Sequence, residues 1–199
     1  LLKPDDKVAV GETNYPSANL CFRSFGASLV RIPVDRHGMK VHVLEERLVK
    51  GLNIRYLYIT SHHHHPTTVS LSPERRLRLL DLADIHDFAI IEDDYSYDFH
   101  YNHSPLLPIA SADRLGSVIY IGSFSKSTAP AFRIGYLVAP VQVIDAAIKY
   151  RRFMDRQGDQ ILDLTLAELL NKGIIQRYKK KAIKAYRKRL DLFCRLFEK

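Results

Sequence analysis

The chain has 199 residues, of which 46% are hydrophobic and 26% are charged, a composition typical of a globular domain and not of a disordered segment. No apolar run approaches the roughly 20 residues of a membrane-spanning helix, so we expect no membrane contact. The two cysteines, Cys21 and Cys194, match no metal-binding spacing, and we expect reduced thiols in a cytoplasmic protein. The first residues read as the middle of a domain, without a Met or a signal segment, so we expect a piece of a longer protein.

Strand-like and helix-like segments alternate through the first 140 residues. In chain order, the hydrophobic pattern predicts strands at 7–12, 28–34, 55–60, 88–93, 117–124 and 134–139, and helices at 17–26, 41–51 and 72–86. Ser72 and Pro73 form a helix-start signal for the last of these helices. This alternation predicts an α/β fold with a mostly parallel sheet that is sandwiched by helices.

Helical sequence follows the last strand. We assign residues 1–150 to a large domain that holds the sheet, incomplete at its N-terminus, and residues 151–199 to helices that lead into a truncated small domain. The net charge of +8 is concentrated at the end of the chain, where residues 172–199 hold eleven Lys and Arg against two acidic residues. Such a basic segment can bind nucleic acid. Apolar residues there recur at helical spacing, however, which favours a packed helix with a solvated basic face: Ile175, Tyr178, Ala182, Tyr186, Leu190, Phe193 and Phe197.

Two polar clusters follow predicted strands, at the sheet edge where α/β proteins bind ligands. The first comprises Asp93, Asp94 and Tyr95, and the second comprises Ser123, Ser125 and Lys126, with Arg133 seven residues further on. A lysine amine can form a Schiff base with an aldehyde, and a carboxylate can hold the proton of a pyridinium ring. Hydroxyl groups and a guanidinium can bind a phosphate. The combination predicts pyridoxal 5'-phosphate (PLP) as cofactor.

The same segments resemble a known family. SFSKSTAPAFRIGYLVAP (123–140) resembles the S-x-S-K-x-x-x-P-x-x-R-x-G-Y motif of fold-type I aminotransferase-like proteins. IEDDYSYDFHY (91–101) resembles the E-D-D-Y-x-x-[ED]-F-x-Y segment of the MocR branch, bacterial regulators in which a GntR-type DNA-binding domain precedes an aminotransferase-like domain. YITSHHHHPTTVSLSPERR (58–76) is similar to their T-P-S-H-Q-x-P-T-G segment, and the resemblance extends over nearly the whole chain.

The resemblance implies roles around the cofactor ring. Lys126 matches the Schiff-base lysine, Asp93 the carboxylate that faces the pyridine nitrogen, and Tyr95 the phenol that bonds the ring oxygen. Tyr15 matches the aromatic residue that stacks on the ring, although N-Y-P replaces the family's G-Y-P, and a buried loop tyrosine is an equal alternative. Around the phosphate, the matching residues are Ser123, Ser125 and Arg133.

The run of four histidines from His62 to His65 suggests a metal site, but consecutive side chains cannot all face one ion, so we expect none. By resemblance, His63 matches the family's histidine, and His65 stands where ordinary aminotransferases carry an asparagine beside the ring oxygen. Thr68 replaces a family glycine, and a positive φ at this position would strain a threonine.

Two functions share these residues. The resemblance favours a PLP-binding effector domain of a GntR/MocR-type transcription regulator, which senses an amino compound or PLP itself. The alternative is a working aminotransferase that transfers an amino group between an amino acid and a 2-oxo acid. In both cases the family implies a homodimer, and DNA would be bound only through a domain outside this chain. The family's glycine-rich phosphate loop and substrate-binding arginine also have no match here, so we expect this chain alone to bind PLP weakly, and a fragment that binds nothing stays an open alternative.

Overall fold

The computed structural model describes residues 2–100, 106–128 and 130–197, so that Tyr101 and Lys199 of the sequence analysis lie outside the described residues. The chain forms two compact units, and each is described by itself. Unit 1 comprises Leu1–Asp94, Leu106–Gly122 and Tyr136–Ile148, and unit 2 comprises Tyr95–Pro105, Ser123–Gly135 and Lys149–Lys199. The division near residue 150 stays a prediction.

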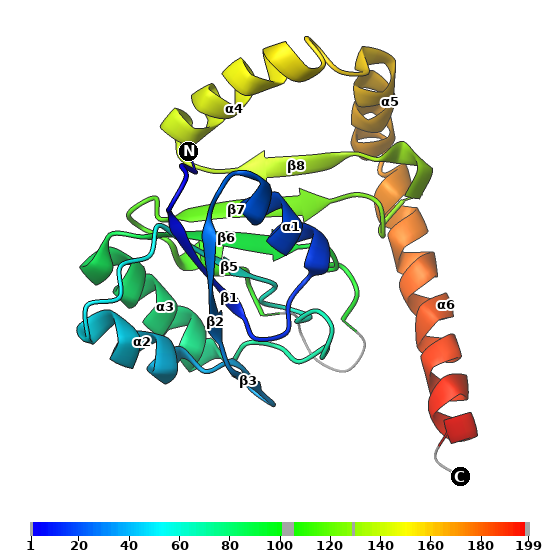
Figure 1. Ribbon diagram of the computed structural model, residues 1–199. Coiled ribbons are helices and arrows are strands. Elements are labelled where there is room, and N and C mark those ends of the chain that lie inside the picture. The colour runs from blue at the N-terminus through cyan, green and yellow to red at the C-terminus, as the bar shows by residue number, and fades with distance from the viewer. Residues whose placement is uncertain (1, 101–105, 129, 198–199) are drawn as a thin grey trace. The chain divides into compact units, whose positions relative to one another are not determined.

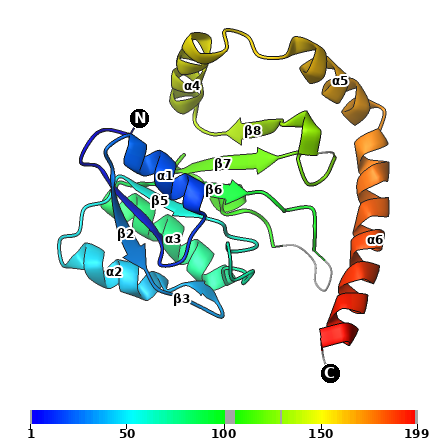
Figure 2. The same ribbon diagram turned by 45° about the vertical axis from the view of Figure 1, so that its right-hand side comes forward.

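Six strands form the sheet of unit 1, in the order β2-β1-β5-β6-β7-β8. They are β1 (Lys7–Gly11), β2 (Ser28–Ile32), β5 (Tyr56–Ile59), β6 (Ala89–Asp94), β7 (Val118–Ser123) and β8 (Gly135–Val138). The pairs from β2 to β7 are parallel, whereas the arrows of β7 and β8 point in opposite directions (Figures 1 and 2). The predicted α/β fold with a mostly parallel sheet is therefore confirmed.

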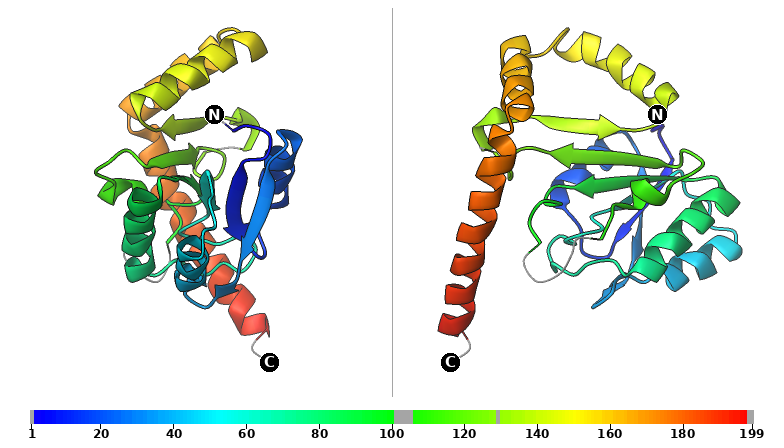
Figure 3. Two further views of the ribbon diagram at one scale, coloured as in Figure 1. Left: turned by 60° about the vertical axis from the view of Figure 1, so that its left-hand side comes forward. Right: turned by 180° about the vertical axis from the view of Figure 1, so that it is seen from behind.

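Helices cover both faces of this sheet (Figure 3). Helix α1 (Pro16–Ser24) lies on one face, and α2 (Val41–Val49) and α3 (Pro73–His86) lie on the other. Because side chains alternate along a strand, Val8 and Val10 pack towards α1 while Ala9 between them joins the larger core under α2 and α3. The inner strands β1 and β5 are buried on both faces over most of their length, which explains their continuous apolar sequence.

The start of α3 follows the sequence signal. Ser72 Oγ accepts a hydrogen bond from the backbone N–H of Arg75 at 3.4 Å, and Pro73 is the first helical residue. The helix ends at Asp87, which adopts a left-handed conformation with φ 52°. These features confirm the predicted bounds of the helix.

The second predicted strand, 28–34, is too long. The chain leaves the sheet after Ile32, because Pro33 has no N–H to continue the ladder. It then forms a small antiparallel hairpin of β3 (Val34–Asp35) and β4 (Gly38–Met39), which the sequence analysis did not predict. Gly38 has φ 89° and lies so close to Leu71 that a Cβ atom would meet its side chain at 2.9 Å.

The last helices are α4 (Val141–Met154), α5 (Gln160–Asn171) and α6 (Ile174–Phe197). The predicted long helix at the end of the chain is confirmed as α6, but the prediction that its apolar face is packed is wrong for most of its length. Ile175 is buried, whereas Tyr178, Phe193 and Phe197 are exposed by 51%, 56% and 72%. Among the described residues, no helix combines the length and hydrophobicity needed to cross a membrane.

Candidate cofactor site

Asp93 lies at the carboxyl end of β6, on the face of the sheet that α1 covers. The hydroxyl group of Tyr58, on the adjacent strand β5, donates a hydrogen bond of 2.6 Å to Asp93 Oδ2. Tyr58 is 3% exposed, and its ring meets the ring of Phe22 from α1 edge-on, with centroids 5.6 Å apart. The tyrosine that holds the carboxylate is therefore itself held by the core.

The environment of Asp93 raises the pKa of its carboxyl group. Burial is the largest cause, because it disfavours the charged form, and the negative charge of Asp94 acts in the same direction. The hydrogen bond from Tyr58 opposes both and lowers the pKa. A cationic N–H group beside this carboxylate would form a strong hydrogen bond with it, because little water competes at a buried position.

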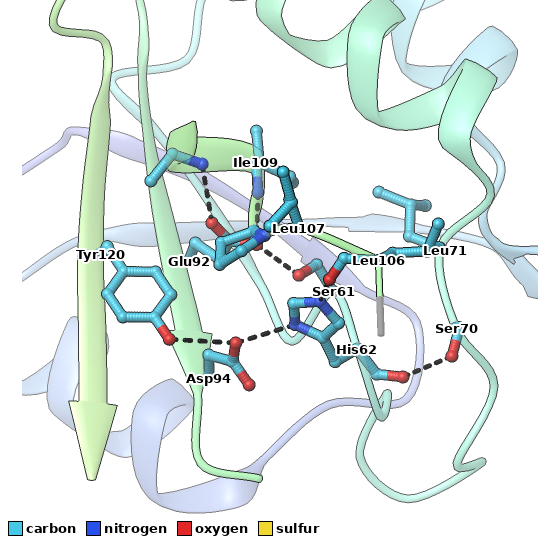
Figure 4. A network of polar contacts seen from close by, with 12 residues as sticks. Ser61, His62, Ser70, Leu71, Glu92, Asp94, Leu106, Leu107, Ile109 and Tyr120 are labelled. Carbon is cyan, nitrogen blue, oxygen red and sulfur yellow. Dashed lines mark hydrogen bonds and ion pairs between the residues drawn. The ribbon is translucent and has the colours of Figure 1, made fainter. Parts of the chain in front are cut away.

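Asp94, the next residue, faces the opposite side of the sheet, because side chains alternate along a strand. Figure 4 shows it beside His62 and Tyr120. Its Oδ2 lies 2.8 Å from His62 Nδ1 and accepts a hydrogen bond of 3.1 Å from the hydroxyl group of Tyr120. His62 Nε2 lies 2.6 Å from the carbonyl oxygen of Leu106, which can only accept, so Nε2 carries a hydrogen. Asp94 is thus held by His62 and Tyr120 on this face, and its carboxylate is committed to structure.

Glu92, two residues before Asp94 on the same face, has no exposed surface. Its carboxylate accepts hydrogen bonds from the hydroxyl group of Ser61 and from the backbone N–H groups of Ile109 and Ala110, the latter at 2.9 and 3.0 Å. Arg76 binds the carbonyl oxygen of Ser61 at 2.8 Å, and burial lowers the pKa of its guanidinium. This network fixes the loop after β5 against β6.

Tyr15 and His65 lie at the ends of neighbouring strands. Tyr15 follows β1 and stands immediately before α1, and His65 follows β5. Their rings meet edge-on with centroids 5.4 Å apart, and Tyr15 is 42% exposed. His65 Nδ1 is buried and has no hydrogen-bond partner among the described residues. Because β1, β5 and β6 are adjacent and parallel, Tyr15 and His65 follow carboxyl ends at the same edge of the sheet at which Asp93 lies near the end of β6.

The histidine run supports the fold of this loop. His62 and His64 are buried, and burial lowers the pKa of His63 and His64. The described residues contain no group of three metal-ligating side chains. Thr68 has φ 62°, so the threonine at this position is strained by roughly 1–3 kcal/mol.

In unit 2, the residues around Lys126 lie on one loop. Ser123 is the last residue of β7, and its Oγ accepts a hydrogen bond of 3.2 Å from the backbone N–H of Ser125. The backbone N–H of Phe124 binds the carbonyl oxygen of Ile134 at 3.0 Å, which closes the loop that carries Lys126. The Lys126 side chain is exposed.

Arg133 and Tyr95 complete the predicted residues of unit 2. Arg133 is exposed and has φ 50°, a backbone conformation that residues other than glycine rarely adopt. Tyr95 directly follows β6 and is half-buried. The predicted residues of this loop, Ser123, Ser125, Lys126 and Arg133, thus lie within eleven consecutive residues.

Each unit, taken by itself, carries side chains whose chemistry suits a part of PLP. Asp93 has one oxygen bonded to Tyr58 and no partner for Oδ1 among the described residues, so it can accept from a pyridinium N–H. The buried Nδ1 of His65 also lacks a partner. The loop of unit 2 carries donors for a phosphate and an amine for an aldehyde.

The whole sequence, residues 1–199, matches the family model of aminotransferase class I and II. The chain belongs to this aminotransferase family. Its six-stranded sheet superimposes on solved members, and the crystal structure of Pyrococcus horikoshii kynurenine aminotransferase, with 30% sequence identity, matches with a TM-score of 0.95 over 100% of the chain and 50% of that protein.

Curated relatives of this aminotransferase-family chain fall into two groups. The aromatic-amino-acid aminotransferase 1 of Thermococcus litoralis is 31% identical over 201 residues, which cover 99% of the chain and 48% of that enzyme. The HTH-type transcriptional regulator TauR of Rhodobacter capsulatus is 34% identical over 198 residues, which cover 100% of the chain and 40% of the regulator. The chain thus spans less than half the length of either relative.

Sequence reasoning named Asp93 and Asp94 but missed Tyr58 as the partner of Asp93 and His62 as the partner of Asp94. Tyr58 lies within an apolar strand, where a tyrosine gives no signal of its own. His62 belonged to a run whose members could not be told apart without the fold. Only the pairing of β5 with β6, which sets Tyr58 opposite Ile91, places the tyrosine near Asp93.

Proposed function

We propose that the protein is a PLP-binding, aminotransferase-like effector domain of a GntR/MocR-type transcription regulator, and that it responds to an amino compound or to PLP. The observation that carries the PLP proposal is the carboxylate of Asp93, held by Tyr58 at the ligand-binding edge of the sheet with Oδ1 open. The regulator reading rests on the EDDYSYDF segment and on the relationship to TauR. When bound, PLP supplies an electron-accepting ring.

In this proposal each residue acts on a stated part of the cofactor. Lys126 Nζ attaches it covalently, and Asp93 accepts the hydrogen bond of the ring nitrogen. Tyr95 donates to the ring oxygen, and Tyr15 packs on the ring face. The phosphate is held by Ser123, Ser125 and Arg133.

A working aminotransferase is the second candidate function. The relationships to the Thermococcus litoralis enzyme, at 31% identity, and to the Pyrococcus horikoshii enzyme favour it. In that case Lys126 Nζ would accept the proton that leaves the α-carbon of the amino acid and return it in the next step, while PLP would supply the electron-accepting ring. Both functions need an amino compound as ligand, a homodimer and the same residues, whereas only the regulator binds DNA, through a domain outside this chain.

The experiment that separates these functions uses the protein expressed from its complete reading frame. PLP is added and its absorbance followed, and then a panel of amino acids and 2-oxo acids is tested. A bound-cofactor spectrum that changes with an amino compound, without formation of a new amino acid, supports the regulator. Sustained amino-group transfer supports the enzyme, and the absence of any PLP binding overturns both.

A further inference from the structure

Tyr58 and Asp93 form a pair that the proposed function does not by itself require. Any carboxylate at the end of β6 could meet a ring nitrogen. Here a phenol hydroxyl from the next strand occupies one of its two oxygens at 2.6 Å. We propose that Tyr58 is a positioning residue, which anchors Asp93 Oδ2 and so directs Oδ1 to the cofactor's ring nitrogen.

The first support for this proposal is that Tyr58 cannot readily move. It is 3% exposed and packs with Val8, Val10 and Ala27, with Phe22 against the edge of its ring. An anchored donor restricts the rotation of the carboxylate, and such preorganisation is what binding sites require of their polar groups. A hydrogen bond from a mobile surface side chain would not have this effect.

The second support is that the consecutive carboxylates of Asp93 and Asp94 have separate hydrogen-bond donors. Asp94 has its own donors, His62 and Tyr120, on the opposite face of the sheet. Because strand side chains alternate, those donors cannot serve Asp93. Tyr58 is the hydrogen-bond donor that the described residues provide for Asp93.

Among the described residues, the groups that act on the titration of Asp93 are Tyr58 on β5 and Asp94 on β6, and Asp94 itself contacts His62 and Tyr120. Asp94 favours the protonated form of Asp93, and Tyr58 favours the ionised form. Removal of the Tyr58 hydroxyl should therefore let Asp93 take up a proton at higher pH. Removing the hydroxyl group of a tyrosine that only packs in the core would not change the pH at which Asp93 takes up a proton.

The proposal rests on the proposed function, so its test has one arm without the cofactor. In PLP-free protein from the complete reading frame, infrared difference spectra against Asp93→Asn report the protonation of Asp93. Tyr58→Phe keeps the ring and its packing, and it should raise the Asp93 midpoint by about one to two pH units, a 10- to 100-fold rise in proton affinity. Tyr120→Phe is the matched control, since it removes a phenol hydroxyl from the neighbouring carboxylate, and it should shift the Asp93 midpoint much less.

The second arm compares two affinities of the protein, one for PLP and one for a PLP analogue in which carbon replaces the ring nitrogen. Tyr58→Phe should reduce the preference for PLP over this analogue by about fivefold and leave the affinity for the analogue unchanged. An equal loss of affinity for both ligands would assign Tyr58 a structural role and overturn the proposal. An unchanged or increased preference for PLP over the analogue would also overturn the proposal. The same holds if Tyr58→Phe does not move the titration midpoint of Asp93. If the wild type does not bind PLP at all, the proposed function fails, while the first arm still decides whether Tyr58 controls Asp93.

Discussion

His62 and Asp94 form a buried pair in which Nδ1 lies 2.8 Å from Oδ2, with side chains exposed by only 2% and 1%. The pair joins the loop after β5 to the end of β6, on the face of the sheet opposite Asp93. It removes Asp94 from the set of groups that could face a ligand beside Asp93. Two adjacent acidic residues thus have separate tasks, one in the scaffold and one in the proposed site.

This separation predicts different effects for two isosteric substitutions in PLP-loaded protein. Asp93→Asn should abolish most of the spectral change caused by amino compounds, because an amide does not hold the ring nitrogen protonated. Asp94→Asn should retain that change, measured by absorbance under the same conditions. If Asp94→Asn proves the more damaging of the two, the assignment of Asp93 to the ring nitrogen is wrong.

His62→Asn should lower the free energy of unfolding by about 3–5 kcal/mol, because it leaves Asp94 buried without its main partner. Denaturant unfolding followed by circular dichroism measures the loss. His42 lies exposed on α2, so His42→Asn should change the stability by less than about 0.5 kcal/mol. Equal stability of the two variants would show that the His62–Asp94 pair contributes nothing.

Asp35 and Arg75 predict a pH-dependent contribution to stability. Arg75 Nη1 and Nη2 bind the two carboxylate oxygens of Asp35 at 2.7 and 2.8 Å, and these hydrogen bonds hold the pKa of Asp35 well below its usual range. A lowered folded-state pKa stabilises the fold above the unfolded-state pKa of about 4, and the contribution is lost as the pH falls further. Asp35→Asn should therefore cost about 1–2 kcal/mol at pH 7, and progressively less below about pH 4.

The control for this prediction is Asp81→Asn on α3. Asp81 lies 3.6 Å from Arg78 in an exposed pair, and its removal should cost less than about 0.5 kcal/mol at either pH. Chemical denaturation of the wild type and both variants at pH 7 and pH 3 measures all four differences. A cost of Asp35→Asn that is the same at both pH values would contradict the ion-pair account.

Much of the fold could be predicted from the sequence because local signals and tertiary packing agree there. The apolar runs of β1 and β5 and the Ser72–Pro73 helix start are of this kind. The β3–β4 hairpin was missed because its strands have only two residues each, too few to show an alternating hydrophobic pattern. The burial of the α6 face was wrongly predicted, since periodicity defines an apolar face but not what covers it.

The candidate site was predictable to a lesser degree. The roles of Lys126 and Asp93 rest on their place near strand ends and on the resemblance, and they stay predictions. The bond from Tyr58 to Asp93 was not predictable, because it joins residues 35 positions apart through the pairing of two parallel strands. The contact of His62 with Asp94 depends on the same strand pairing and on the path of the loop after β5.

The central claim is that Lys126 binds PLP covalently. Protein from the complete reading frame is mixed with PLP, reduced with borohydride, digested and analysed by mass spectrometry for a pyridoxyl group on the peptide that contains Lys126. We predict one modified site at Lys126, its loss in Lys126→Ala, and its retention in the control variant Lys184→Ala, which removes an exposed lysine of α6. Modification that persists after Lys126→Ala, or that is spread evenly over the surface lysines, would contradict the claim.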